Sequence, residues 1–486
     1  MAKFYITTAI PYVNAAPHIG HTLEFVQADV IARIHRLMGD DTLLLSGSDE
    51  NALKNVQAAS EKGVPIQEFI DTNAELFASI AKRLNVRFDV FQKGSDRNKH
   101  YPASQKLWSL CSAREDIYKK EYEGLYCVGC EAFYAKEDLN ENGECFEHPG
   151  KKLETVRESN YFFRLSKYQQ QLIDLIRQDV IKIIPDFRKK EVLSFLSQPL
   201  QDISISRTNE RAKNWGVPVP GDDSQRMYVW FDALNIYQSG IGFGWDEKNY
   251  TAWWPADIHV IGKGITRFHA VYWPAFLLSA GLPIPKSIFV HGYFTVNGQK
   301  MSKTLGNVID PNTILDEFGT DALRYYLTRE IPPFSDGDFS KKRLTELYNA
   351  DLANGLGNLV ARIAKLSSQT DPGISPITIP EYPTLLTREE WAPYAKALTV
   401  YRFDEALSCI WEKIRDLDRS LDAHAPWKLS GKEKTAVCES ILQPLVECAV
   451  LLCPFLPETS DKIIRILAVR PIQPAPILFP RIQENA

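Results

Sequence analysis

Residues 3–25 read KFYITTAIPYVNAAPHIGHTLEF, and this stretch decides the fold of the N-terminal part of the chain. Its β-branched and aromatic beginning, from Lys3 to Ile10, predicts a strand. The two prolines and the asparagine that follow predict a turn. From Gly20 onward apolar residues recur at helical spacing. A strand, a tight loop and a helix in this order direct backbone N–H groups and the helix dipole toward an anion.

Two histidines, His18 and His21, stand at the entrance of the predicted helix, with Gly20 between them. Imidazole N–H groups can donate hydrogen bonds to phosphate oxygens, and glycine lets a flat ring approach the backbone. The stretch therefore predicts a phosphate-binding loop. An ordinary strand-to-helix turn with two capping histidines is the alternative that this stretch alone leaves open.

Length, composition and charge limit the class of the protein. The chain has 486 residues, which predicts two to four domains, and its 44% hydrophobic and 24% charged residues are globular values. We see no run of eighteen apolar residues and no apolar leader, so we expect neither a membrane span nor a signal peptide, and a cytoplasmic location. The net charge of −5 argues against a generally basic nucleic-acid binder, although local basic patches remain compatible with it.

A second strand is predicted within residues 41–51, an apolar run that ends in polar residues that could bind a ligand. In open α/β sheets ligands bind at the carboxyl ends of the strands, so the carboxylate of Asp49 could hold an ammonium group there. The alternative is that Asp49 caps the helix predicted from Asn51 to Lys62. Further strands are predicted at residues 89–91, 259–264 and 287–292. Aromatic residues cluster between residues 227 and 276, and hydrophobic core is their simplest interpretation.

Residues 127–148 contain two pairs of metal-ligating side chains. Cys127 and Cys130 are separated by two residues, as are Cys145 and His148. The spacing predicts a tetrahedral zinc knuckle with three thiolates and one imidazole, and a structural site because protein fills every position. Metal binding would supply much of the folding energy of this polar loop. Buried cysteines without metal are the alternative, and the cysteines elsewhere in the chain are predicted core thiols.

A cationic loop and a helical region follow. Lys300 and Lys303 lie among small polar residues and glycines, and such a loop suits a leaving polyphosphate, while a solvated surface turn is the alternative. A helix predicted over residues 349–366 places Asn358 and Arg362 on one face. Residues 367–386 predict a linker, and the chain from residue 391 is helical with an interruption at residues 425–427.

Taken together, residues 11–14 and 18–21 (PYVN and HIGH) and residues 300–304 (KMSKT) resemble the two ATP signatures of class I aminoacyl-tRNA synthetases. These signatures, the knuckle between them and the helical C-terminal part resemble the methionyl-tRNA synthetase family, from residue 3 to about residue 470. The resemblance implies an α/β fold with four regions: a Rossmann-like catalytic domain (residues 1–115 and 226–295), a connective insertion with the zinc knuckle (116–225), a stem-contact region with the KMSK loop (296–350) and an all-α anticodon-binding domain (351–486).

The resemblance also implies the activity and its partners. The chain would activate L-methionine with ATP to methionyl-adenylate and transfer it to the 3′ end of tRNA(Met), as a monomer with one structural Zn²⁺ and with Mg²⁺ brought by ATP. A synthetase for another apolar amino acid, a small-molecule nucleotidyltransferase and a non-catalytic tRNA-binding protein are the alternatives. The large editing insertion of the isoleucine, valine and leucine enzymes would not fit easily between residues 116 and 225.

Roles of single residues follow from the resemblance, position by position. The implied catalytic residues are His18, His21, Lys300 and Lys303, and ATP would also contact Pro11 and Gly20. The implied methionine-binding residues are Ile10, Tyr12, Asp49, Trp230, Leu234, Tyr237 and His269, of which Asp49 would bind the ammonium group. The implied zinc ligands are Cys127, Cys130, Cys145 and His148. The implied anticodon-binding residues are Asn358, Arg362, Pro426 and Trp427.

The sequence departs from the family pattern near the predicted active site. The family usually continues Glu-His-Gly after the aspartate, where this chain has Glu50, Asn51 and Ala52. The family usually has aspartate after Gly262-Lys263, where this chain has Gly264. These departures concern the substrate contacts and the rate, while the predicted reaction class is unchanged. Thr304 replaces the usual serine and keeps a hydroxyl group.

Overall fold

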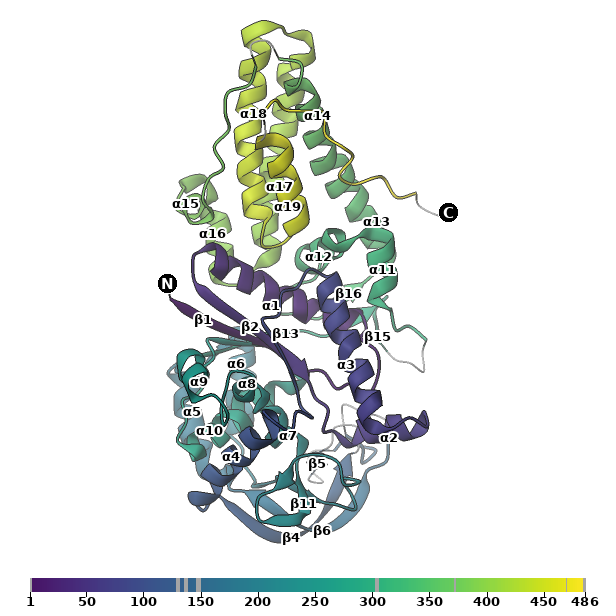
Figure 1. Ribbon diagram of the computed structural model, residues 1–486, viewed down its shortest axis with the longest axis vertical. Coiled ribbons are helices and arrows are strands. Elements are labelled where there is room, and N and C mark those ends of the chain that lie inside the picture. Colours follow the sequence, from purple (N-terminus) through teal and green to yellow (C-terminus); the bar gives the residue numbers. More distant parts are fainter. Residues whose placement is uncertain are drawn as a thin grey trace.

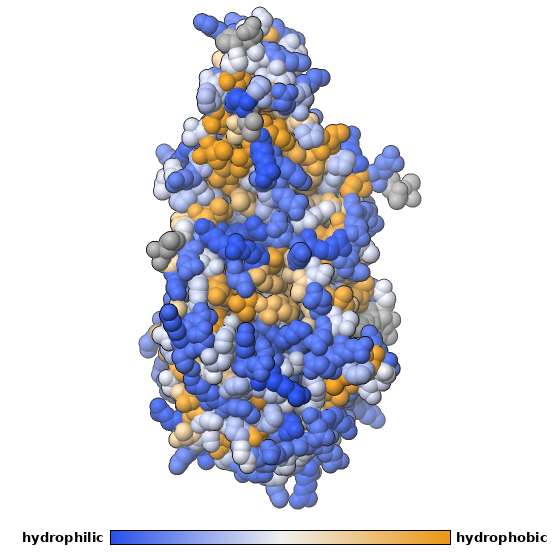
Figure 2. Space-filling view, viewed as in Figure 1, coloured by the Kyte–Doolittle hydropathy of each residue, from blue (hydrophilic) through white to orange (hydrophobic). Residues whose placement is uncertain are grey.

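The computed structural model describes residues 2–127, 132–134, 139–145, 150–301, 306–370, 373–468 and 470–483. Figure 1 shows an elongated molecule with a β-sheet in its middle, a bundle of helices at one end and a β-rich part at the other. Figure 2 shows a largely hydrophilic surface on the same face, with hydrophobic residues gathered over the helical end and around the middle.

A six-stranded, wholly parallel sheet forms the middle of the molecule, which confirms the predicted α/β core. Its strands, in spatial order, are β3 (Val90–Lys93), β2 (Asp41–Ser48), β1 (Lys3–Thr8), β12 (Ile258–Gly262), β13 (Ser287–His291) and β7 (Lys182–Ile184). The chain proceeds from β1 outward to β2 and β3, and later from β12 outward to β13 on the other side. The order therefore reverses between β1 and β12, and such a switch point is where open α/β sheets bind ligands.

Both faces of this sheet are covered, and the strand sequences are accordingly apolar throughout. Tyr5 and Ile6 are both fully buried although they point to opposite faces, and they belong to two different hydrophobic clusters. Helix α1 (Ile19–Leu37) packs on β1, β2 and β12 on one face. The remaining helices of this part are α2 (Leu53–Glu61), α3 (Ile66–Arg83), α4 (His100–Ala113), α7 (Val229–Ala233), α8 (Ile236–Ser239), α9 (Glu247–Trp253), the 3₁₀-helix η3 (Lys263–Ile265), the π-helix η4 (Phe268–Tyr272) and α10 (Trp273–Ala280).

Residues 117–227 form most of the β-rich end. A four-stranded sheet has the order β5 (Ala132–Tyr134), β4 (Ile117–Cys127), β6 (Glu154–Phe163) and β8 (Ile203–Ser204). A three-stranded sheet has the order β10 (Pro218–Val219), β11 (Asp222–Met227) and β9 (Ser206–Thr208). Helices η2 (Leu165–Tyr168), α5 (Gln169–Arg177) and α6 (Asp186–Leu196) complete the segment. Its strand β7 joins the main sheet beside β13, which the sequence analysis did not predict, because three residues are too short to show a periodicity.

The chain after β13 leads into the helical end. A small sheet has the order β15 (Gln299–Lys300), β14 (Phe294–Val296) and β16 (Gly337–Phe339). Helices α11 (Pro311–Phe318), α12 (Thr320–Arg329), α13 (Lys341–Leu347) and the π-helix η5 (Tyr348–Gly357) connect it to the bundle. The bundle contains α14 (Asn358–Ser367), α15 (Tyr382–Leu386), η6 (Glu389–Trp391), α16 (Ala392–Thr399), α17 (Phe403–His424), η7 (Pro426–Lys428), α18 (Gly431–Leu452) and α19 (Pro457–Ala468).

Helix α18 is the central helix of this bundle. Among the described residues it is the one helix long and apolar enough by composition to cross a membrane, and 67% of its apolar window is buried within the protein. It packs against α14, α15, α17 and α19. This packing accounts for the apolar sequence, because a helix that is covered on several sides has few positions for polar residues.

Candidate active site

The predicted substrate-binding residues meet at the carboxyl ends of β1 and β2. Beyond the ends of these strands, Tyr12 and Asp49 form an isolated parallel bridge, and the backbone N–H of Asp49 donates to the carbonyl of Pro11 at 2.9 Å. Asp49 is buried. It does not cap α2, whose N-cap is Ala52, so the alternative interpretation of Asp49 as a capping residue is wrong. The carboxylate therefore lies in the predicted ligand-binding position.

His18 and His21 cap the N-terminus of α1 reciprocally. The backbone N–H of Gly20 donates to His18 Nδ1 at 3.1 Å, and the backbone N–H of His18 donates to His21 Nδ1 at 3.1 Å. The two rings lie 3.9 Å apart between centroids. A neutral imidazole that accepts a hydrogen bond on Nδ1 carries its proton on Nε2. The capping bonds thus assign an Nε2–H donor to each ring.

Protonation of His21 is disfavoured. Burial, together with the neighbouring imidazole of His18, lowers the pKa of His21 well below its ordinary value. His21 is therefore a neutral hydrogen-bond donor at pH 7, where a charged imidazolium would lose the Nδ1 acceptor that caps the helix. The capping interpretation and the phosphate-binding interpretation are compatible. Capping uses Nδ1 of each ring as an acceptor, whereas phosphate binding would use the Nε2–H group as a donor.

The two signature segments come together in the structure. A Cβ atom placed on Gly20 would lie 2.9 Å from Met301 Cε, so Met301 of the KMSK stretch packs against the glycine between the two histidines. The backbone N–H of Ile19 also donates to the carbonyl of Ile309 at 3.1 Å. Lys303 and the side chain of Lys300 lie outside the described residues.

An aromatic wall stands beside Asp49. The ring of Trp230 stacks on Phe268 at 3.7 Å between centroids and meets the ring of Tyr12 edge to face at 6.3 Å. Leu234 belongs to the same hydrophobic cluster as Trp230, and the partly buried Ile10 packs against this cluster. The Lys54 ammonium lies 2.8 Å from the centroid of the Tyr12 ring. Polarisable rings of this kind suit a thioether side chain, and the face of the Tyr12 ring suits a cation.

Tyr237 and His269 form a buried pair next to this wall, since His269 follows Phe268 in η4. His269 Nδ1 lies 3.0 Å from the carbonyl of Ile265, which accepts only, so the proton of a neutral His269 is on Nδ1. Its Nε2 then accepts from the Tyr237 hydroxyl at 2.8 Å. Burial lowers the pKa of His269 from 6.5 to about 4. The pair is therefore neutral and hydrogen-bonded, and such a pair suits contact with an uncharged side chain.

Comparison with known proteins identifies the family. The family model described as "tRNA synthetases class I (M)" matches residues 4–364. A methionine–tRNA ligase of Thermotoga maritima is 42% identical over 475 residues, which cover 95% of this chain and 75% of that protein. A methionine–tRNA ligase of Brucella suis is 40% identical over 477 residues, 96% of this chain and 92% of that protein. The chain belongs to the methionyl-tRNA synthetase family.

A solved structure of a methionyl-tRNA synthetase supports the same assignment. The Mycobacterium tuberculosis enzyme in complex with methionyl-adenylate superimposes with a TM-score of 0.89 at 37% identity, over 98% of this chain and 96% of that chain. The family predicted from the signatures is therefore confirmed.

Within this methionyl-tRNA synthetase fold, the structure gives a physical reason for glycine at position 264. A Cβ atom there would lie 2.5 Å from the Tyr293 hydroxyl oxygen and 3.4 Å from Tyr293 Cε1. The Lys263 ammonium in turn lies 4.4 Å from the centroid of the Tyr293 ring. The tyrosine thus fills the space that a side chain at position 264 would need, in place of the aspartate that the family usually has.

Phe268 was not singled out by the sequence analysis as a pocket residue, and neither was His259. Phe268 stacks on Trp230, and its position next to His269 in an aromatic run was a signal for it. His259 Nδ1 lies 2.6 Å from the Thr7 hydroxyl, and its ring lies 4.5 Å from that of Tyr237. Burial, and then the neighbouring His269, lowers the pKa of His259 well below its ordinary value.

Two of the predicted zinc ligands are described. Cys127 ends β4, Cys145 lies 18 residues later, and both side chains are buried with their sulfur atoms 3.2 Å apart. This separation is too long for a disulfide, in which the sulfurs are about 2.05 Å apart. Cys130 and His148 lie outside the described residues, and among the residues that are described no three metal-ligating side chains form a group. Two adjacent buried thiols nevertheless have the donor chemistry that zinc requires.

Of the predicted anticodon-binding residues, Arg362 of α14 and Trp427 of η7 lie close together beside α17. The Arg362 guanidinium lies 5.7 Å from the centroid of the Trp427 ring, which is 50% exposed. Arg362 also donates to Asp418 Oδ1 at 2.8 Å and pairs with Asp422. Pro426 is buried and Asn358, at the start of α14, is exposed. The structure therefore brings Arg362 and Trp427 into one surface that combines a cation with an exposed ring.

Proposed function

We propose that the site at the carboxyl ends of β1 and β2 binds both substrates of methionine activation. As a methionine–tRNA ligase, the chain activates L-methionine with ATP and transfers it to the 3′ end of tRNA(Met). The observation that carries the proposed site is the bridge between Tyr12 and Asp49. It places a buried carboxylate next to the aromatic wall and next to the loop that carries the histidine pair.

In the first step a carboxylate oxygen of methionine attacks the α-phosphorus of ATP, and the bond from that phosphorus to the bridging oxygen of pyrophosphate breaks. His18 and His21 donate from their Nε2–H groups to the phosphate oxygens, on which charge grows in the transition state. Lys300 and Lys303 neutralise the leaving pyrophosphate, and Mg²⁺ enters with ATP. Pro11 and Gly20 give the nucleotide a close approach to the backbone. No protein nucleophile is required, because positioning and charge stabilisation supply the catalysis.

Methionine is held at both of its ends. Asp49 accepts from the ammonium group, and this contact fixes the carboxylate of methionine toward the histidine pair. The side chain enters the pocket formed by Ile10, Tyr12, Trp230, Leu234, Tyr237 and His269. A neutral Tyr237–His269 pair at its end accepts a thioether but gives no partner to a charged side chain, so lysine or glutamate would bury an unpaired charge.

In the second step a hydroxyl group of the terminal adenosine of tRNA attacks the carbonyl of methionyl-adenylate. The ester bond to the ribose forms, the bond to the phosphate breaks, and AMP leaves. Asn358, Arg362, Pro426 and Trp427 select the tRNA at its anticodon, where unpaired bases offer hydrogen-bonding edges and stacking faces. Cys127, Cys130, Cys145 and His148 would hold a structural zinc ion, which would keep the inserted knuckle folded. The enzyme acts as a monomer in the cytoplasm.

Amino-acid-dependent exchange of pyrophosphate into ATP, measured with each of the twenty amino acids, tests this function. We expect exchange with methionine, and exchange with another amino acid alone would overturn the assignment. Exchange with none of them would favour a non-catalytic tRNA-binding protein. For the site itself, Asp49→Asn should raise KM for methionine and leave KM for ATP within about twofold, because the buried carboxylate partner of the ammonium group is lost.

A further inference from the structure

We propose that Asn51 is a positioning residue that sets the distance between Asp49 and the pocket for the methionine side chain, by tying the loop after β2 to α7 through Asp232. The inference rests on the methionine site proposed above. It assigns a specific task to a residue at which this chain departs from the family pattern. The sequence alone did not indicate this task, because Asn51 and Asp232 are 181 positions apart.

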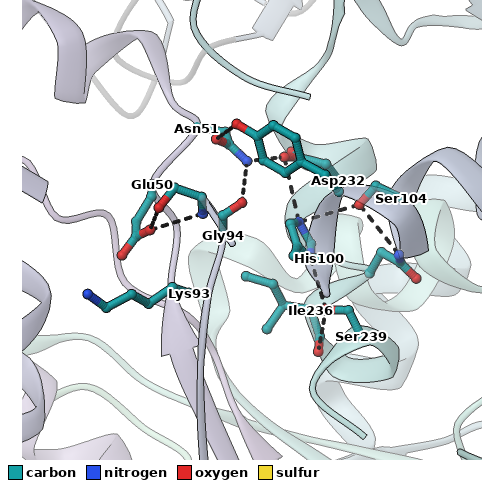
Figure 3. A network of polar contacts seen from close by, with 12 residues as sticks. Glu50, Asn51, Lys93, Gly94, His100, Ser104, Asp232, Ile236 and Ser239 are labelled. Carbon is teal, nitrogen blue, oxygen red and sulfur yellow. Dashed lines mark hydrogen bonds and ion pairs between the residues drawn. The ribbon is translucent and has the colours of Figure 1, made fainter. Parts of the chain in front are cut away.

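The side-chain amide of Asn51 uses both of its N–H bonds. Asn51 Nδ2 donates to Asp232 Oδ2 at 2.6 Å and to the carbonyl of Gly94 at 2.8 Å (Figure 3). The Tyr101 hydroxyl approaches Asn51 Oδ1 at 3.4 Å. A single side chain thus connects three segments, namely the loop after β2, the loop after β3 and helix α7.

The far partner, Asp232, lies in the middle of the pocket wall. It follows Trp230 by two residues and precedes Leu234 by two, and its side chain is 1% exposed. A buried carboxylate needs donors, and Asn51 supplies a short hydrogen bond to one oxygen. Burial raises the pKa of Asp232, while the bonds from its neighbours oppose this rise.

His100 attaches the same carboxylate to the next turn of the wall. His100 Nε2 lies 3.7 Å from Asp232 Oδ2, and His100 Nδ1 lies 2.8 Å from the hydroxyl oxygen of Ser239 in α8 (Figure 3). Because α8 also carries Tyr237, the network follows the wall from Trp230 to Tyr237. A shift of Asn51 would therefore displace the residues from Trp230 to Tyr237 together, rather than one residue alone.

The loop that carries Asn51 is itself fixed from its other side. Glu50 Oε2 accepts from the backbone N–H of Ser95 at 3.0 Å, and Glu50 Oε1 accepts from the Ser48 hydroxyl at 2.7 Å. The indole N–H of Trp215 donates to the carbonyl of Glu50 at 2.8 Å. The carbonyl of Asp49 accepts from Asn55 Nδ2 at 2.9 Å. With the loop held in this way, the bond from Asn51 to Asp232 determines how far the pocket wall lies from the Asp49 carboxylate.

This geometry bears on which amino acid is accepted. Methionine must reach the Asp49 carboxylate with its ammonium group and the aromatic wall with its thioether at the same time. If the wall shifts relative to Asp49, one of the two contacts is lost while the ATP contacts at the histidine pair remain. A change at Asn51 should therefore affect methionine binding more than ATP binding.

Asn51→Asp tests the inference with almost no change in shape. It replaces the donor by a carboxylate facing the buried Asp232, and two like charges in contact cannot both stay ionised at low cost. In pyrophosphate exchange at pH 8 we expect KM for methionine to rise at least tenfold and KM for ATP to change less than twofold. Toward pH 6 the methionine KM should fall back, because the two carboxyl groups can then share a proton.

Two further variants make the test specific. Asn98→Asp adds the same charge at an exposed position of the neighbouring loop and should leave both KM values unchanged. Asn51→Asp combined with Asp232→Asn removes the carboxylate pair and restores a donor opposite an acceptor, so it should recover most of the methionine KM. Equal rises in both KM values, or a pH-independent loss in Asn51→Asp, would overturn the inference and assign Asn51 a merely structural role.

The failure of this inference can be told apart from the failure of the proposed methionine site. If Asp49→Asn raises KM for methionine but Asn51→Asp does not, the site stands and the positioning role of Asn51 is wrong. If neither variant changes KM for methionine, the site itself is wrong, and the inference is wrong with it.

Discussion

Arg324 Nη1 lies 2.8 Å from Asp29 Oδ2, and both side chains are 0% exposed. Asp29 belongs to α1, the helix whose N-terminus is capped by the histidine pair, and Arg324 belongs to α12. The same guanidinium donates to the carbonyls of Pro454 at 2.9 Å and Phe455 at 2.7 Å, in the turn between α18 and α19. One buried cation therefore joins the active-site helix to the helical end of the molecule.

Arg324→Met should destabilise the protein strongly. The methionine side chain fills part of the volume, but it leaves Asp29 without one of its cationic partners. It also removes the donor to the carbonyls of Leu84, Pro454 and Phe455. Breaking a buried pair costs about 3–5 kcal/mol. Chemical unfolding followed by circular dichroism measures the loss. Arg419→Met is the matched control, because Arg419 is 78% exposed beside Asp416 and such pairs are worth less than about 1 kcal/mol. Similar losses in both variants would contradict the role assigned to Arg324.

The free energy of unfolding should decrease as the pH is lowered from 6.5 to about 4, partly because of His269. Burial lowers the pKa of His269 to about 4, whereas in the unfolded chain it is about 6.5. In this window the unfolded state binds a proton that the folded state does not, so acidification favours unfolding by about 3 kcal/mol across the window. His269→Gln does not titrate and should show a shallower fall in the free energy of unfolding. His424→Gln, at an exposed position, should keep the wild-type slope, and parallel slopes for all three proteins would contradict the prediction.

The sequence predicts those parts of the fold and site whose signals are local. The main strands before residue 292, apart from β7, are predicted from apolar runs that end in polar residues, because a parallel sheet buries both of its faces. The sequence predicts the order of strand, turn and helix around residues 11–21, and the structure has this order; the anion site at this loop stays a prediction. Asp49 is placed correctly at a strand end, since ligands of such sheets bind there.

Contacts between distant segments could not be predicted from these signals. Asn51 and Asp232 are both ordinary polar residues, and only folding brings them together. The need for glycine at position 264 could not be predicted either, because the contacting Tyr293 lies in a different segment, after β13. The protons on His18 and His21 depend on backbone N–H groups that point at particular ring nitrogens, and sequence spacing does not reveal such directions.

Gly264→Ala should impair activation through a clash with Tyr293. The added Cβ would lie 2.5 Å from the tyrosine hydroxyl oxygen, closer than any normal contact, so the ring must move. We expect a loss of at least roughly tenfold in kcat/KM for pyrophosphate exchange, because overpacking shifts neighbouring groups and catalysis is sensitive to small displacements. Tyr293→Phe removes the clashing oxygen, and the double variant should therefore lose less than the sum of the two single changes. Additive losses would show that the two positions do not interact.

The inserted knuckle should contain zinc. We expect about one zinc ion per chain in protein purified without chelator, measured by atomic emission, because two adjacent buried thiols match a thiolate-rich structural site. Cys145→Ala should lose the metal and become susceptible to proteolysis within residues 117–163, since such loops fold around their ion. Cys409→Ala, a cysteine in α17, should keep it. Wild-type protein without zinc, or full zinc content in Cys145→Ala, would refute the site.

Trp427→Ala should separate tRNA recognition from amino-acid activation. Helix α17 starts beside the main sheet, where Phe403 lies 6.3 Å from Phe289 between ring centroids, and it runs for 22 residues before Trp427 follows. At about 1.5 Å per residue the ring is roughly 30 Å from the sheet, too far to contact methionine or ATP.

Loss of one stacking ring typically costs about 1–3 kcal/mol, so kcat/KM for tRNA charging by Trp427→Ala should fall roughly 10- to 100-fold, while pyrophosphate exchange stays within about twofold. Val400→Ala removes an equally exposed apolar side chain from the helical bundle and should leave both activities intact. Charging assays with tRNA(Met) transcripts of altered anticodon add a second measurement. The wild-type preference for the correct anticodon should shrink in Trp427→Ala, and an equal loss of charging and exchange would contradict an anticodon role for this ring.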